Sequence, residues 1–207
     1  MGQPEKLGII KSVLPAPKQR LSEENPHANF VADAIRYEMG VDIGLVNAGN
    51  IRNAFEPGAI DSSDTKAISP FGDGMVICPI NEKDLVEGIK AGCKSVVDKN
   101  GKPGLFYASG LTYTVKKGTG ELLNMTYTDK DGKQTPIDIN NPNPDKIYRV
   151  AADDFVLSGG DGIPSLNQLE HAEQKFEFSE DKLIADYIKH SNKPIEINQT
   201  GRINIVD

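Results

Sequence analysis

The hydrophobic pattern in the first half of the chain predicts two amphipathic helices. The first follows the pair Asn25-Pro26, which offers a capping side chain and a first-turn proline. Its apolar face lies between residues 30 and 35, and Gly40 ends it. The second helix follows the polar run 81–84, which has the character of a capping box, and repeats apolar residues over 85–97.

Shorter apolar runs between and after these helices predict strands. From about residue 105 onward apolar and polar residues alternate, which is typical of β structure, and the turn 129–132 favours a hairpin. The expected strands are 42–47, 75–80, 111–115, 122–128, 135–139 and 147–152, with short ones around Ile195 and Ile203. A third helix is expected over 181–190. This mixture predicts an α+β or mixed α/β fold, and the lack of repeats or long linkers predicts one domain over 1–207.

Composition limits the classes of partner. The net charge is −7 and the pI is about 5.1, so a nucleic acid polymer or an anionic membrane surface would be repelled unless a basic patch were present, and no basic run supplies one. No apolar stretch reaches the roughly 20 residues that a membrane span needs. A ligand phosphate would therefore depend on individual arginines, and the candidates are Arg20, Arg36, Arg52, Arg149 and Arg202.

The residue types that usually perform hydrolysis are poorly represented. Three histidines, expected at the surface or at helix ends, lack any metal-binding spacing: His27, His171 and His190. The turn at Ser158 lacks the nucleophile-elbow pattern of serine hydrolases. Cys78 and Cys93 are expected as buried apolar thiols, with a single disulfide as the alternative. The chain is therefore predicted to hold no catalytic residue and no metal of its own.

Three polar, glycine-bearing turns remain as a candidate binding site. They are Asn47-Ala-Gly-Asn-Ile-Arg52, Ser69-Pro-Phe-Gly-Asp73 and the segment 154–162. Taken alone, each fits an ordinary backbone turn. Two of them nevertheless carry a phenylalanine, Phe71 or Phe155, beside residues expected to be exposed. An aromatic face at a pocket mouth suits stacking on a heterocycle, but the residues alone favour packing in the core for each ring.

In this order, the turns resemble the C-terminal domain of the 5'-nucleotidase family. The resemblance covers nearly the whole chain through ordered matches at Arg20-Leu-Ser-Glu23, Asn29-Phe-Val-Ala-Asp-Ala-Ile35, Asn47 to Arg52, Pro70-Phe-Gly72, Ser109-Gly-Leu111, Phe155 to Gly162 and Gly201-Arg-Ile203. They are similar to the family's R-x-x-E, N-[LF]-[IV]-x-D-A, N-G-G-G-I-R, N-F-x-x-x-G-G-D-G and G-R-I segments. The resemblance implies a layered α/β/β/α arrangement with helices outside two sheets.

The resemblance also implies roles for individual residues. Phe71 and Phe155 would sandwich the base of a nucleotide, and Asp161 would accept hydrogen bonds from the ribose hydroxyls. Arg52 would bind phosphate oxygens through its guanidinium donors, and Asn47 would contact the nucleoside through its amide. The chain would thereby recognise a nucleotide or nucleoside.

The same resemblance gives expectations for several further positions. Arg20 would assist in binding phosphate, and Asp73 stands where family members often have asparagine, so its carboxylate would repel phosphate or accept from a base amino group. Ala48 and Asn50 replace glycines of the family turn, which requires that Ala48 keep a negative φ or be strained. Asp33 is interpreted as a structural helix residue and not as a ligand contact.

In that family the hydrolysis belongs to an N-terminal metallophosphoesterase domain that holds two divalent metals. By resemblance this chain is the substrate-binding half, without that domain, and its location is extracytoplasmic although no signal peptide is present. Two alternatives remain: a non-catalytic interaction module that has lost the nucleotide, and the C-terminal domain of a thiosulfohydrolase-like relative.

Overall fold

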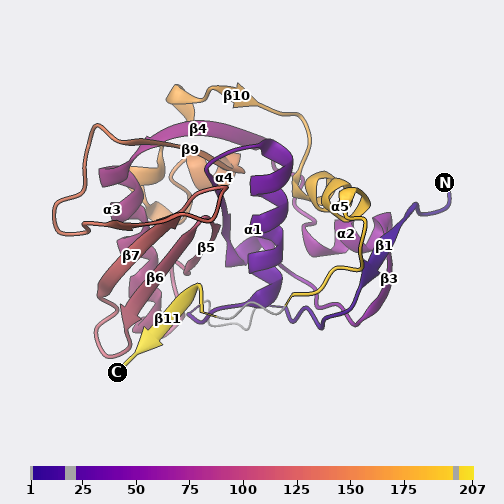
Figure 1. The fold of residues 1–207 in the computed structure, drawn as a ribbon, viewed down its shortest axis with the longest axis horizontal. Coiled ribbons are helices and arrows are strands. Elements are labelled where there is room, and N and C mark those ends of the chain that lie inside the picture. The colour runs from indigo at the N-terminus through magenta and orange to yellow at the C-terminus, as the bar shows by residue number, and fades with distance from the viewer. Residues whose placement is uncertain (1, 17–21, 198–200) are drawn as a thin grey trace.

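The computed structural model describes residues 2–16, 22–197 and 201–207, and their fold is mixed α/β (Figure 1). The helices are α1 (Pro26–Met39), α2 (Ser62–Ile68), α3 (Glu82–Cys93), α4 (Asp154–Leu157) and α5 (Glu180–His190). The strands are β1 (Lys6–Ile10), β2 (Ile43–Asn47), β3 (Gly58–Asp61), β4 (Met75–Asn81), β5 (Phe106–Ser109), β6 (Leu111–Lys116), β7 (Leu122–Thr128), β8 (Gln134–Ile137), β9 (Ile147–Asp153), β10 (Gln174–Lys175) and β11 (Ile203–Val206).

Within the described residues these strands form three sheets. A five-stranded sheet has the order β10-β4-β9-β2-β5, a four-stranded sheet has the order β11-β6-β7-β8, and β1 pairs with β3. The predicted hairpin is confirmed as β7 and β8. Figure 1 shows α1 near the middle of the molecule, with the four-stranded sheet on one side and the β1–β3 ribbon, α2 and α5 on the other.

Helix α1 covers the five-stranded sheet, packing against β2 and β5. Its predicted ends are confirmed, because the Asn25 side chain accepts from the Ala28 backbone N–H at 2.9 Å and Gly40 adopts a left-handed conformation at φ 62°. The helix lies so close to β2 that a Cβ at Gly44 would stand 2.4 Å from the Ala32 carbonyl oxygen. Glycine at this position is therefore required for the packing.

Three details differ from or refine the expectations. The Asn81 side chain caps α3, but Asp84 accepts from the Asn81 side-chain amide where a capping box would use the backbone N–H. His27 lies at a helix end as expected but is buried against the Phe55 ring, and burial lowers its pKa to about 4. The expectation for the cysteines is confirmed, since both are buried and free.

The topology brings three loops to one edge of the five-stranded sheet. Strands β2 and β9 are parallel, so their carboxyl ends, Asn47 and Asp153, lie at the same edge. Strand β4 is antiparallel to β9 and begins there, with Met75 opposite Asp153. The loop after β2, the loop before β4 and the segment after β9 therefore meet, in the kind of crevice where open α/β sheets bind ligands.

No helix in the described part of the chain is both long enough and apolar enough to cross a membrane.

Candidate functional site

The three loops enclose a cavity of about 340 Å³, here called the loop pocket. Its lining residues are Asn47, Gly49, Asn50, Arg52, Phe71, Asp73, Lys102, Pro103, Phe155 and Asp161. Six of the seven residues expected in the site from the sequence are thus in one place. The seventh, Arg20, lies outside the described residues.

Both phenylalanine rings of the loop pocket are exposed. Phe71 is 50% exposed and Phe155 is 41% exposed, so packing in the core, the alternative left open by the sequence, is wrong for each. Neither ring contacts the other, although both line the same cavity. Gly160 allows the position of Phe155, because a Cβ there would approach the Phe155 ring to 2.7 Å. The rings are separate apolar walls of an open pocket.

Arg52 lies over the face of Phe71, with its guanidinium carbon 4.9 Å from the ring centroid. Among the described residues its guanidinium makes no ion pair. Two other candidate arginines are engaged elsewhere: Arg36 donates to the Thr128 carbonyl, and Arg149 pairs with Glu173. Of the arginines that the structure describes, Arg52 is the one that lines the loop pocket.

Asp161 stands in a strained backbone conformation. Its φ is 62°, and it is the one non-glycine residue with positive φ in the described part of the chain. Burial raises the pKa of Asp161, against the opposing effects of the neighbouring Asn47 side chain and of Lys102. The Asn47 Oδ1 atom is buried and has no donor within the described residues. A ligand N–H or O–H would satisfy this acceptor.

The remaining polar groups modify the charge of the pocket. Burial raises the pKa of Asp73, and the nearby carboxylate of Asp154 raises it further. Ala48 keeps a negative φ within a short helical turn, so the strain considered for it is not present. Lys102 was not identified from the sequence, because a single lysine before Pro103 in a glycine-containing loop carries no distinguishing signal.

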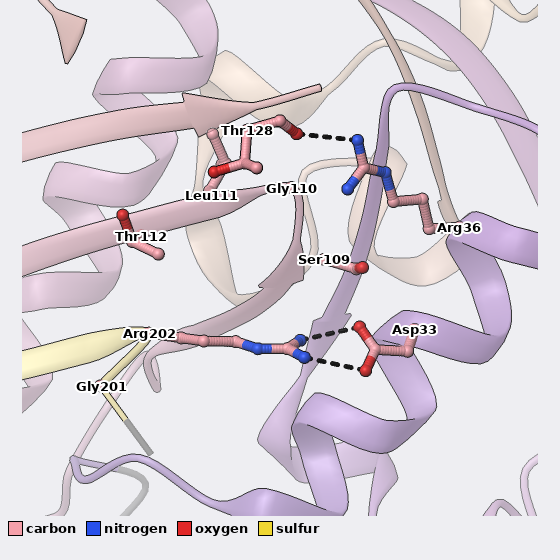
Figure 2. Close-up of a pocket in the computed structure, with 9 residues that line it drawn as sticks. All are labelled: Asp33, Arg36, Ser109, Gly110, Leu111, Thr112, Thr128, Gly201 and Arg202. Carbon is pink, nitrogen blue, oxygen red and sulfur yellow. Dashed lines mark hydrogen bonds and ion pairs between the residues drawn. The ribbon is translucent and has the colours of Figure 1, made fainter. Parts of the chain in front are cut away.

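A second cavity of about 430 Å³, here called the α1 cavity, lies between α1, the turn that joins β5 to β6, and residues 201–202 just before β11 (Figure 2). Arg202 crosses it and donates to both Asp33 oxygens at 2.8 Å each. Arg36 lies on α1, as Asp33 does, and its guanidinium donates to the Thr128 carbonyl at the end of β7 at 2.8 Å. Asp33 is therefore a structural residue in this fold, as expected.

Among the described residues, no group of three or more histidine, cysteine, aspartate or glutamate side chains lies in a position to hold an ion.

Comparison with solved structures first defines the class of fold. The chain resembles a 5'-nucleotidase precursor from Thermus thermophilus with a TM-score of 0.82 and 22% identity, covering 98% of this chain and 40% of that one. It resembles the NAD nucleotidase of Haemophilus influenzae with a TM-score of 0.82 and 17% identity, covering 98% and 38%. The mixed α/β fold is therefore the one found in the C-terminal part of such proteins.

The family follows from the sequence match. The model described as "5'-nucleotidase, C-terminal domain" matches residues 6–168, and the chain belongs to this family. A curated relative, the trifunctional nucleotide phosphoesterase protein YfkN of Bacillus subtilis, is 25% identical over 215 residues. That alignment covers 98% of this chain but 14% of YfkN, so the chain spans a small part of its relative.

Proposed function

We propose that this chain is the nucleotide-recognition domain of a 5'-nucleotidase-type phosphohydrolase. The observation that carries the proposal is that two half-exposed phenylalanine rings from distant loops line one cavity beside a guanidinium group and a carboxylate. A nucleotide has the matching parts: a flat base, ribose hydroxyl donors and a phosphate.

The proposed mode of binding assigns each part to one wall of the loop pocket. The base stacks between Phe71 and Phe155, which contributes about 1–3 kcal/mol by analogy with other base-stacking proteins. The ribose hydroxyls donate to Asp161, whose carboxylate lies beside the Asn47 side chain. Arg52 donates to the phosphate, and its stacking on Phe71 limits the conformations it must lose on binding.

The proposed contribution to catalysis is positioning. The bound phosphate would be presented to a separate metallophosphoesterase domain holding two divalent metals, which supply the Lewis acid chemistry. Holding a substrate in a reactive orientation lowers a barrier by several kcal/mol, up to about 7–11 kcal/mol in favourable cases. A domain without a reactive group would therefore still be required for turnover, and by the same resemblance we expect an extracytoplasmic location.

Calorimetric titration tests the proposal. AMP, adenosine and thiosulfate are titrated into the chain, and we expect AMP to bind more tightly than adenosine and thiosulfate not to bind. Binding of thiosulfate alone would favour the thiosulfohydrolase-like alternative. No binding of any nucleotide or nucleoside, with UMP, UDP-glucose and 3'-AMP included, would favour an interaction module that has lost its ligand.

A further inference from the structure

Two carboxyl groups are buried directly beneath the loop pocket. Asp153 is the last residue of β9 and is 1% exposed, and Glu180 is the first residue of α5 and is 2% exposed. The two side chains lie close enough together that the Asp153 carboxylate raises the pKa of Glu180, whose burial is the larger cause. Two ionised carboxylates can only accept hydrogen bonds and repel each other in the interior, so this arrangement favours a proton on one of them.

The pair makes one hydrogen bond to each of the three loops. The Asn50 amide donates to Asp153 from the loop that carries Arg52. The Ser69 hydroxyl donates to Glu180 Oε2 at 3.1 Å from the loop that carries Phe71. The other Asp153 oxygen accepts from the Val156 backbone N–H at 2.8 Å, which caps the short helix that carries Phe155. The pair is thus the point where the pocket walls are connected.

The surroundings of the pair favour retention of its proton. The charged groups that act on it are the carboxylates of Asp73, from the loop before β4, and Asp154, from α4. Within the described residues neither member makes an ion pair with a cation. Burial therefore raises the pKa of both groups, that of Glu180 the further. Glu180 Oε1 is buried and accepts no hydrogen bond from the described residues, so a proton on this oxygen would let it donate to the Asp153 carboxylate.

We propose that Asp153 and Glu180 are positioning residues of the loop pocket, sharing one proton and holding the three loops at the spacing that separates the phenylalanine walls. Loss of the shared proton places two negative charges against each other in the interior and loosens the loops. This inference rests on the proposed function for the choice of ligand, but the connection between the loops is independent of it.

Three variants test the inference. Glu180→Leu removes the connection, whereas Glu180→Gln keeps an acceptor for Ser69 and supplies a permanent donor to Asp153. Glu82→Gln is the matched control, because Glu82 is the first residue of α3, is 6% exposed and accepts from the Tyr148 hydroxyl at 2.8 Å. It lies at the other end of β4 and β9, where Asn81 is opposite Ile147.

Hydrogen exchange provides a readout that needs no ligand. In Glu180→Leu we expect protection factors to fall about tenfold or more in segments 47–52, 69–74 and 153–162 together, with little change elsewhere. Wild-type protection in these segments should fall as the pH rises from about 6 to about 9, whereas Glu180→Gln should stay constant. Unchanged protection in Glu180→Leu would overturn the inference. If that variant does not fold, an identical pH profile in wild type and Glu180→Gln would overturn it.

AMP titration then separates the two proposals. We expect affinity to fall about tenfold in Glu180→Leu and to be retained in Glu180→Gln and Glu82→Gln. Wild-type protein that fails to bind AMP would contradict the proposed function, while the exchange data would still decide the inference. Binding by wild type and Glu180→Leu with equal affinity would leave the proposed function standing and overturn the inference.

Discussion

The loop pocket and the α1 cavity are lined by similar kinds of residue and differ in what those residues already contact. The α1 cavity is the larger of the two, at about 430 Å³ against about 340 Å³ for the loop pocket. Its arginine and carboxylate, Arg202 and Asp33, satisfy each other in a bidentate pair (Figure 2). In the loop pocket Arg52 makes no ion pair among the described residues, and Asn47 Oδ1 has no donor there. Arg36, which also lines the α1 cavity, donates to the Thr128 carbonyl but has a buried Nε atom without a partner. The loop pocket is therefore marked, not by volume, but by combining a guanidinium that no described carboxylate or carbonyl engages with a buried acceptor that lacks a donor.

The two cavities also differ in backbone strain, which is present in the loop pocket. The α1 cavity is built from a regular helix, from paired strands and from Gly110 and Gly201, whose positive φ a glycine adopts without strain. The loop pocket contains Asp161 at φ 62°, a conformation that costs of order 1–3 kcal/mol in a non-glycine residue. A strained conformation persists only where the surrounding structure enforces it. Such residues cluster at functional sites.

The largest expected difference between the two cavities is the loss of AMP affinity when an aromatic wall of the loop pocket is removed. Phe155→Ala should weaken AMP binding by about 1–3 kcal/mol in calorimetry, because the base loses one stacking face. Tyr37→Ala is the control, since Tyr37 is 66% exposed and lines a hollow beside the α1 cavity. Equal AMP affinity in wild type and Phe155→Ala would contradict the stacking model.

The reverse experiment acts on the α1 cavity. Asp33→Ala should lower the free energy of unfolding by about 1–2 kcal/mol, because Arg202 loses its bidentate partner. The Arg202 side chain is 15% exposed, so solvent screens this pair only in part. Denaturant unfolding measures this loss. AMP affinity should not change, and a parallel loss of affinity would show that the two cavities are not independent.

Sequence patterns predicted the parts of the fold whose signals are local. The Asn25 cap and the Gly40 stop define α1 because both act within one turn of the helix end. The strands β1 and β3 and the helix α2 were not anticipated, since segments of 4–7 residues give too few periods.

The candidate site was likewise predicted in part. The order of the turns indicated which residues to expect together, and the structure brings Phe71 and Phe155 to one cavity. Residue type alone favoured core packing for each ring. The exposure of the rings could not be predicted, because it depends on how strands that are distant in sequence pair. The pair of Asp153 and Glu180 was missed because the two carboxyls are far apart in sequence, and Lys102 was missed because a single loop lysine carries no distinguishing signal.

A smaller effect tests the phosphate end of the loop pocket. Arg52→Ala should cost about 1 kcal/mol of AMP affinity and much less of adenosine affinity, because a partly solvated guanidinium contact is screened. The measurement is the ratio of the two dissociation constants by calorimetry. An equal loss for both ligands would indicate that Arg52 supports the base-binding wall and does not contact phosphate.

The smallest effect expected is a pH dependence at the ribose end. Burial raises the pKa of Asp161, so this carboxylate is protonated at a higher pH than an ordinary aspartate and then loses acceptor capacity. Adenosine affinity should therefore weaken modestly from about pH 7 to about pH 5, and less so in Asp161→Asn. Affinity that increases on acidification would contradict the assigned role.

The most direct test of the central claim is a search for intermolecular nuclear Overhauser effects between AMP and the chain. Contacts from the base protons to the ring protons of both Phe71 and Phe155 are predicted, with no contact to Tyr37 beside the α1 cavity. Contacts to the residues of the α1 cavity, or to neither phenylalanine, would contradict the assignment of the loop pocket as the nucleotide site.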